Sequence, residues 1–144
     1  MKNIQCYTCG KMGGLSFEEY SEWRNEITDR LKSRCDDNVN LTVINPPEFF
    51  NFEMDVSSYT NTEIYEFEMR AVRESDFIIA NLNYNDSIGT SHELAVACEN
   101  RIPVIALVDD KKVSSIHPFD LECVSKICNT MDDLVDYISY YYLM

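Results

Sequence analysis

Two glutamates stand out as residues that could do chemistry. Segment 89–94 reads Gly-Thr-Ser-His-Glu-Leu and places Glu93 in the first turn of a predicted helix. A carboxylate there can attack an electrophilic sugar carbon, and the nearby helix N-terminus would keep it ionised. The spacing of Thr90 and Glu93 equally fits a capping box, in which the glutamate only closes the helix end. The residues themselves leave both interpretations open.

Glu68 is the candidate partner of Glu93. Glycosyl transfer usually needs two carboxyls in different environments. One is ionised and attacks the anomeric carbon, and the other is protonated and assists the leaving group. Glu68 lies on a predicted helix over residues 61–75. It can play this part only if that helix leans over the site, and a solvated helix residue is the alternative.

The loop after the first predicted strand is rich in glycine. It contains Gly10, Gly13 and Gly14, and Lys11 follows the first of them. Glycine lets a ligand approach the backbone closely, and amides here and at the start of the next helix could receive an anion. The pattern is neither G-x-G-x-x-G nor a P-loop, so standard dinucleotide or triphosphate binding is not indicated. A flexible turn is the alternative.

The cysteines and histidines give no clear metal or redox motif. Cys6 and Cys9 have C-x-x-C spacing, but a glycine loop follows them and no second C-x-x-C completes a zinc site. Buried or incidental thiols are the favoured interpretation, and a C-x-x-C redox protein is kept as a further hypothesis. His92 and His117 are the only histidines, and neither has enough candidate ligands around it. We expect no metal site and no cofactor.

Predicted strands alternate with predicted helices. We expect strands at 4–8, 41–44, 76–82, 102–108 and 124–128, and helices from Ser16, over 61–75, over 90–100 and over 131–142. The strand cores are continuously apolar, so helices must cover both faces of the sheet. This predicts a single α/β domain over residues 1–144, with a doubly wound, five-stranded parallel sheet of order 2-1-3-4-5. Its ligand crevice lies beyond the carboxyl ends of strands one and three.

The composition restricts the function classes. The chain has 144 residues, with 12 Lys+Arg against 25 Asp+Glu, which gives a net charge of −13. Such a surface repels phosphate backbones, so we expect no nucleic-acid polymer as partner. No apolar run reaches the roughly 20 residues that span a bilayer, and no apolar signal region opens the chain. We therefore expect a cytoplasmic protein with reduced cysteines and no membrane partner.

Several motifs together resemble the nucleoside 2-deoxyribosyltransferase family, which includes 2'-deoxynucleoside 5'-phosphate N-hydrolases. They are Tyr7-x-Cys9-Gly10 followed by Gly13-Gly14, the segment Ser75–Leu82, Gly89-Thr90-x-x-Glu93-Leu94, and Ile102-Pro103-Val104-Ile105. The similarity extends over roughly residues 4–108, and the order and spacing of the motifs make it fairly specific. It implies cleavage or transfer at the N-glycosidic bond of a small nucleoside or nucleotide.

The resemblance assigns roles residue by residue. Glu93 matches the nucleophile that forms a glycosyl-enzyme intermediate, and Tyr7 matches the tyrosine that hydrogen-bonds it. Eight residues before Asp76 the family usually has an aspartate that assists the leaving base. Here that position is Glu68, one methylene longer. Gly89 belongs to the same motif as Glu93 and is expected to contact substrate.

Other matched positions concern the 5' end of the substrate. Ser87 stands where transferases often have an aspartate and the nucleotide hydrolases have a serine, and a neutral hydroxyl accepts a 5'-phosphate more readily than a carboxylate does. Lys11 and the loop glycines would add phosphate donors. Ser114 or Ser115 resembles a serine that the hydrolases lend to a neighbouring subunit. The resemblance therefore implies a homodimer or larger homo-oligomer with shared sites.

The sequence thus predicts an enzyme that acts on 2'-deoxynucleosides or their 5'-monophosphates through Glu93, Glu68 and Tyr7. Ser87 favours the monophosphate and therefore hydrolysis. A non-catalytic nucleotide-binding or sequestering protein of the same fold is the principal alternative, because glutamate replaces the usual aspartate at position 68.

Overall fold

The computed structural model describes residues 1–50 and 59–144. Its five strands are β1 (Lys2–Gly10), β2 (Val39–Ile44), β3 (Phe77–Asn81), β4 (Val104–Leu107) and β5 (Lys126–Cys128). They form one sheet of order β2-β1-β3-β4-β5 in which every neighbouring pair is parallel. The predicted sheet and its order are confirmed. Residues 51–58 of the predicted long loop at 48–60 lie outside the described residues.

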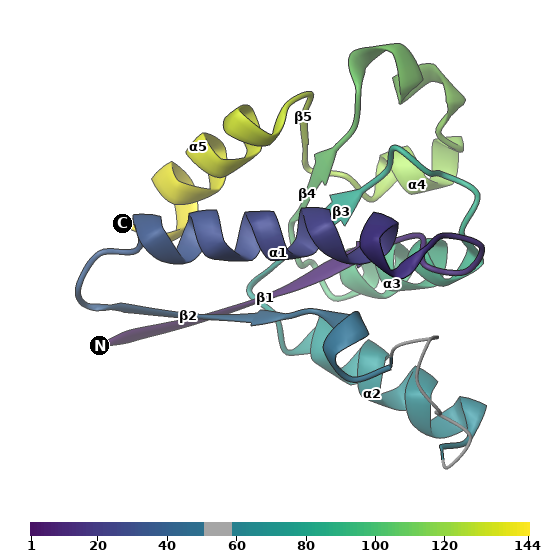
Figure 1. Cartoon of the computed structure of the whole chain (residues 1–144), viewed down its shortest axis with the longest axis horizontal. Helices are drawn as coiled ribbons and strands as arrows, with labels where there is room; N and C mark the ends of the chain where they lie inside the picture. Colours follow the sequence, from purple (N-terminus) through teal and green to yellow (C-terminus); the bar gives the residue numbers. More distant parts are fainter. Residues whose placement is uncertain (51–58) are drawn as a thin grey trace.

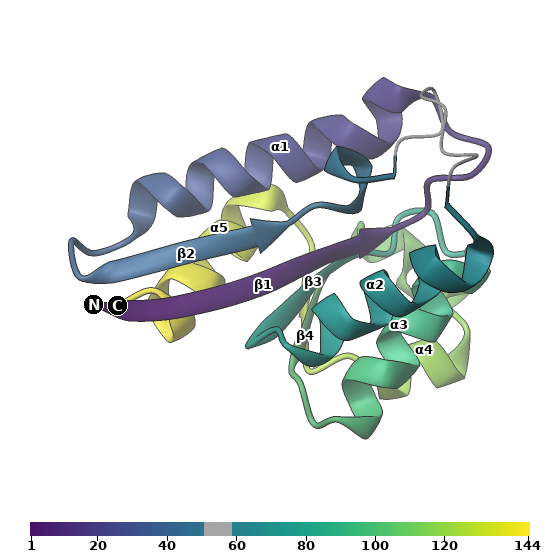
Figure 2. The same cartoon turned by 90° about the horizontal axis from the view of Figure 1, so that it is seen from below.

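Helices cover both faces of the sheet (Figures 1 and 2). They are α1 (Phe17–Arg34), α2 (Asn61–Arg73), α3 (Ile88–Glu99), α4 (Pro118–Glu122) and α5 (Met131–Tyr142), with short 3₁₀ helices η1 (Pro46–Glu48) and η2 (Asp110–Ser115). One apolar cluster joins α1 and α5 to the sheet, and the other joins α2 and α3 to its opposite face. The chain therefore winds to both sides, as the continuous apolar strands predict.

Alternation along β1 separates the two layers. Cys6 points into the cluster with α1 and α5, whereas Tyr7 and Cys9 point into the cluster with α2 and α3. Cys6 and Cys9 are fully buried free thiols, and burial raises the pKa of each well above its ordinary value. Their positions on opposite faces of one strand do not suit a redox pair, and the prediction of buried thiols is confirmed.

Two expectations about helix boundaries need correction. The predicted helix at 90–100 begins two residues earlier, at Ile88, and its N-cap is Ser87 rather than Thr90. Helix α4 also follows a stretch read as a loop, with His117 as its N-cap and Pro118 in its first turn. By contrast, α1 starts where the sequence predicts, with Ser16 as its N-cap and a capping box that Ser16 forms with Glu19.

The C-terminal aromatic residues divide between core and surface. Tyr142 stacks on Phe77 of β3 with ring centroids 4.4 Å apart, and Leu143 is fully buried. Tyr140 and Tyr141 remain exposed. Within the described ranges, no helix is both long and apolar enough to cross a bilayer.

Candidate active site

The predicted catalytic side chains meet at the carboxyl edge of β1 and β3, where the winding of the chain reverses. Tyr7 comes from the end of β1, Glu68 from α2 and Glu93 from α3. Each of the three influences the ionisation of at least one other, which shows that they share one environment. Topology therefore brings together residues that are up to 86 positions apart in the chain (93 − 7).

Glu93 is buried, with only 6% of its surface exposed. Because α3 is capped by Ser87, Glu93 lies in the second helical turn, and the predicted capping box with Thr90 is wrong. The expectation that the helix end keeps Glu93 ionised also needs revision. Burial first, and the negative charge of Glu68 second, raise the pKa of Glu93 to about 8. A buried carboxyl without a capping role is a stronger functional candidate than the sequence indicated.

Glu68 is half-buried on the face of α2 that looks toward Glu93. Desolvation raises the pKa of Glu68 to about 6, while the charge of Arg24 opposes that rise. The condition that α2 lean over the site is therefore met. Two neighbouring carboxyls with raised pKa values retain a proton between them near neutral pH. One group can thus act as a base or nucleophile while the other carries a proton.

The Tyr7 hydroxyl faces the Glu93 carboxyl. Tyr7 is fully buried, and its hydroxyl has no hydrogen bond of regular geometry to any described residue. Its interaction with Glu93 nevertheless lowers the pKa of that carboxyl, and burial followed by the charge of Glu93 raises the pKa of Tyr7. Tyr7 therefore stays protonated, and its hydroxyl is available as a donor to the Glu93 carboxyl.

Arg24 is a site residue that the sequence analysis missed. It is 1% exposed, and its guanidinium donates to Thr8 Oγ1 at 3.2 Å, to the Gly10 carbonyl at 3.1 Å and to the Tyr20 carbonyl. Its positive charge lowers the pKa values of Glu68 and Glu93. The available signal was position, because Arg24 occupies the buried stripe of α1 that also contains Tyr20, Ile27 and Leu31.

A polar network fixes this arginine beneath the end of β1. Thr8 Oγ1 donates to Asn45 Oδ1 at 2.7 Å, and Asn45 Nδ2 donates to Thr28 Oγ1 at 3.0 Å. Thr28 Oγ1 in turn donates to the carbonyl of Arg24 at 2.7 Å. The network ties α1, β1 and the residue before η1 to one another. Such closed polar networks rigidify the groups they connect.

Of the three glycines in the predicted loop, Gly10 is the last residue of β1, and Gly13 and Gly14 follow the strand. A Cβ on Gly10 would lie 3.0 Å from the Trp23 ring and 3.3 Å from the Asn81 carbonyl oxygen, so this position is closed to larger residues. Gly14 has a φ of +84°, which favours glycine, and a Cβ on Gly13 would meet nothing within 4 Å. Gly13 and Gly14 are exposed at the same end of the sheet as Glu93 and Glu68.

Lys11 forms an ion pair with Asp86. Its Nζ lies 2.8 Å from Asp86 Oδ2, which joins the loop after β1 to the loop after β3. Ser87 follows Asp86 and accepts hydrogen bonds from the Thr90 amide at 3.2 Å and the Thr90 hydroxyl at 3.0 Å. A serine hydroxyl that accepts in this way still has its own hydrogen to donate. Ser87 can therefore both cap α3 and bind an anion.

Ser115 and Gly89 border the same edge. Asn85, in the loop after β3, donates through Nδ2 to Ser115 Oγ at 2.6 Å, and Ser115 donates to the Lys112 carbonyl at 2.7 Å. Gly89 is the second residue of α3. Ser115 is exposed on η2.

The histidines serve local contacts. His117 Nδ1 accepts a hydrogen bond from the Phe119 amide at 3.1 Å, which is a helix-capping contact. The His92 ring makes an edge contact with Tyr65, with centroids 6.0 Å apart. Across residues 1–50 and 59–144, no group of three or more His, Cys, Asp or Glu side chains is placed to hold a metal ion.

Comparison with known proteins identifies the family and the fold. The sequence model for nucleoside 2-deoxyribosyltransferase matches residues 13–132. A conserved protein from Enterococcus faecalis V583 has the same fold, with a TM-score of 0.74 and 18% identity over 95% of this chain and 98% of its own. The Clostridium botulinum CMP N-glycosidase BcmB aligns with a TM-score of 0.60 and 16% identity over 95% and 99% of the two chains. No sequence among the curated proteins matches significantly.

Proposed function

The chain belongs to the nucleoside 2-deoxyribosyltransferase family, and we propose that it cleaves the N-glycosidic bond of 2'-deoxynucleoside 5'-monophosphates or the corresponding nucleosides. The observation that carries this proposal is the pair of carboxyls at the crevice of the sheet, buried Glu93 and half-buried Glu68. Carboxyls kept in different environments are the groups that glycosidic chemistry requires.

In the proposed first step, a carboxylate oxygen of Glu93 forms a bond to C1' of the sugar. The bond between C1' and the base nitrogen breaks, and its electron pair leaves with the base. Glu68 supplies the proton that the departing base needs. Tyr7 holds the Glu93 carboxyl in position by donating to its oxygen that does not attack.

The second step releases the enzyme. Water attacks C1' of the glycosyl intermediate, the bond to Glu93 breaks, and Glu68 takes up the proton that water loses. A second base in place of water would give transfer instead. The two outcomes use the same residues, so they differ only in which acceptor reaches C1'.

The 5' side of the site supports a nucleotide substrate. Ser87 has a hydroxyl hydrogen available to an anion, and Gly13 and Gly14 leave the nearby backbone open. BcmB, which shares this fold, acts on CMP. Hydrolysis of a monophosphate is therefore the favoured form of the reaction.

Release of free base is the direct test. The protein is incubated with 2'-deoxynucleosides and their 5'-monophosphates, and free base is separated by chromatography, with and without a second base as acceptor. We expect base release that is fastest with the monophosphates and no exchange product. Absence of turnover with every substrate, or turnover that Glu93→Ala leaves undiminished, would refute the mechanism.

A nucleotide-binding protein without catalysis is the second candidate. The observation that favours it is the deep burial of Glu93, which raises its pKa to about 8 and makes it a poor nucleophile at neutral pH unless the substrate changes its environment. Calorimetry distinguishes the two, because tight monophosphate binding with no base release over long incubation supports binding alone.

A further inference from the structure

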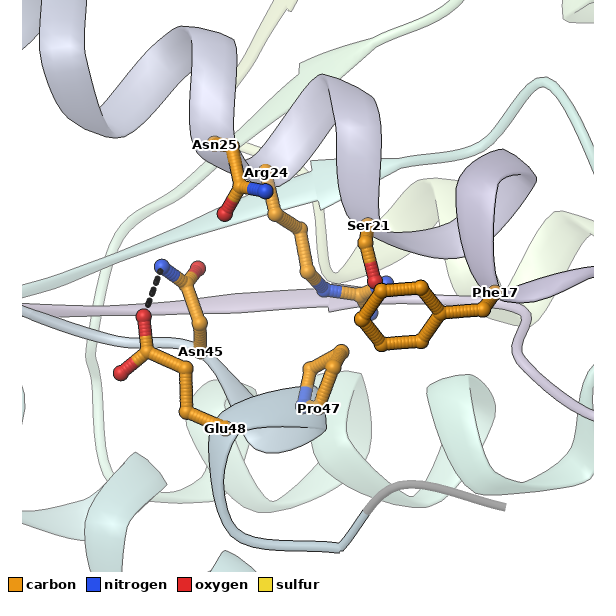
Figure 3. Close-up of a pocket in the computed structure, with 7 residues that line it drawn as sticks. All are labelled: Phe17, Ser21, Arg24, Asn25, Asn45, Pro47 and Glu48. Carbon is orange, nitrogen blue, oxygen red and sulfur yellow. Dashed lines mark hydrogen bonds between the residues drawn. The ribbon is translucent and has the colours of Figure 1, made fainter. Parts of the chain in front are cut away.

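A cavity lies between α1 and η1, beside the carboxyl edge of the sheet, and we call it the α1–η1 cavity (Figure 3). Its walls include Phe17, Ser21 and Arg24 from α1, with Asn45, Pro47 and Glu48 facing them. Its volume is about 180 Å³. Pockets for whole ligands usually measure roughly 300–1,000 Å³, so this cavity suits one ring of a substrate.

The upper wall of the cavity carries hydrogen-bond donors without partners. Ser21 is 5% exposed, and its hydroxyl is buried without a hydrogen bond to any residue in the described part of the chain. Arg24 uses three of the five N–H groups of its guanidinium on Thr8, Gly10 and Tyr20, which leaves two. Buried polar groups are normally satisfied, so these donors indicate a ligand acceptor.

The opposite wall has a different character. Glu48 brings a carboxylate that accepts a hydrogen bond from Asn45 Nδ2 at 3.5 Å, and Pro47 adds apolar surface, as Phe17 does from the α1 side. The carboxylate would repel a phosphate but accepts hydrogen bonds from ring N–H or amino groups. The cavity therefore fits a flat, neutral ring with a carbonyl on one side and an N–H donor on another.

Arg24 connects the cavity to the catalytic pair. It lines the cavity, donates to the carbonyl of Gly10 three residues beyond Tyr7, and carries the charge that acts on both Glu68 and Glu93. No other residue described above takes part in both places. The cavity and the two carboxyls are thus connected through one side chain, Arg24.

We propose that the α1–η1 cavity receives the leaving base, and that this base is a pyrimidine whose 2-oxo group accepts hydrogen bonds from Arg24 and Ser21. The inference rests on the proposed function and names its substrate class. In a pyrimidine nucleoside the 2-oxo group is bonded to the carbon next to the glycosidic nitrogen. A purine has no carbonyl beside its glycosidic nitrogen.

The chemistry explains why donors belong at this place. When the bond from C1' to N1 breaks, its electron pair passes to the pyrimidine ring and is shared between N1 and the 2-oxo oxygen. Arg24 and Ser21 stabilise that developing negative charge, and Glu68 then supplies the proton to the ring. Fixed donors aimed at a developing oxyanion act most strongly in a buried site such as this one.

Binding of free bases tests the proposal without requiring turnover. Calorimetry with cytosine, uracil, adenine and hypoxanthine is expected to show binding of the two pyrimidines only. Ser21→Ala should weaken that binding about fivefold to tenfold, the effect of one hydrogen bond, with an unchanged or higher melting temperature. Ser139→Ala is the matched control, because Ser139 has a buried hydroxyl without a described partner but lies on α5. It should bind like wild type.

Two results would overturn the proposal. One is purine binding equal to pyrimidine binding, or no binding of pyrimidines at all. The other is identical pyrimidine affinity in Ser21→Ala and Ser139→Ala. Arg24→Lys, which keeps the charge but loses the planar fork of donors, should weaken pyrimidine binding more than Ser21→Ala does. If the protein binds pyrimidines in this way yet releases no base from any nucleotide, the proposed catalysis fails while the cavity assignment stands.

Turnover supplies a further readout that a purely structural role would not change. Ser21→Ala should lower kcat/KM for a pyrimidine nucleotide about tenfold, yet have a smaller effect on its 5-fluoro analogue. The fluorinated base leaves more easily and depends less on stabilisation of its oxygen. An equal loss on both substrates would contradict the role assigned to the serine.

Discussion

Lys11 and Asp86 form an ion pair of 2.8 Å that links the loop after β1 to the loop after β3 across the candidate site. Asp86 is exposed, and the lysine beside it lowers its pKa. The pair has two consequences for a phosphate. It fixes the two loops on which Ser87 and the open glycines stand, and it neutralises the lysine that was expected to attract the anion.

Asp86→Asn should therefore improve monophosphate binding. Removal of the carboxylate frees Lys11 for the phosphate and removes a like charge beside it, so we expect KM for a monophosphate to fall several-fold, and KM for the nucleoside to stay unchanged. Steady-state kinetics at low and high salt measures this, since the gain should shrink with salt. Asp110→Asn, an exposed acidic residue on η2, is the control. A variant with weaker monophosphate binding would show that the ion pair is needed to shape the site.

Glu93→Gln should abolish base release. The amide preserves size but cannot form the glycosyl intermediate, and loss of a nucleophile typically costs a factor of about 10³ or more. Glu99→Gln changes an exposed glutamate on the same helix and should leave the rate unaffected. Rapid-quench assays measure both. A Glu93→Gln rate within about tenfold of wild type would place the nucleophile elsewhere.

The burial of Glu93 also predicts a pH dependence of stability. Its pKa in the folded protein is about 8, against 4.5 for an ordinary glutamate. Because the folded state binds this proton more tightly than the unfolded state, the stabilisation is fully present below about pH 4.5 and is lost as pH rises through about 8. Urea unfolding at several pH values should show this fall in wild type and a flatter curve in Glu93→Gln. Parallel curves for the two proteins would contradict the raised pKa.

Exposed apolar residues near Ser115 predict self-association. Ile88 and Phe119 are each 79% exposed, and they lie at the starts of α3 and α4. Contact with a second copy would cover them and bring its Ser115 toward the site. Sedimentation should show a dimer for wild type and a monomer for Phe119→Asp. Tyr140→Asp, which changes an exposed aromatic residue on α5, should remain dimeric. A monomeric wild type would refute this.

The sequence predicted the sheet order because β3 and β4 are continuously apolar, and this pattern requires cover on both faces. It also placed Glu93, Glu68 and Tyr7 on the elements that meet at one edge. It failed at the start of α3 and at one buried charge on α1. Thr90 and Glu93 have capping-box spacing, but the Thr90 amide donates to the Ser87 hydroxyl, so Ser87 is the N-cap and α3 begins before Thr90. Arg24 was not predicted as a site residue because a single charged residue on an amphipathic helix usually lies on the solvent-exposed face.

Glu68 gives the most discriminating prediction about catalysis, because it departs from the family's usual aspartate. Burial raises its pKa to about 6, so Glu68 holds a proton more readily than an exposed glutamate does, as a proton donor requires. Glu68→Gln cannot donate a proton, and base release should fall by about 10²-fold or more. Glu68→Asp keeps the carboxyl but shortens its reach by one methylene, so its rate of base release should lie between those of wild type and Glu68→Gln.

Leaving-group dependence separates proton donation from a structural effect. A substrate whose base departs without protonation should be cleaved by Glu68→Gln nearly as fast as by wild type, and the alkaline limb of the wild-type pH profile should be absent in this variant. Glu66→Gln, exposed on the same helix, is the control and should match wild type on every substrate. If Glu68→Gln loses the same factor on good and poor leaving groups, the side chain orients the substrate and the proton comes from elsewhere.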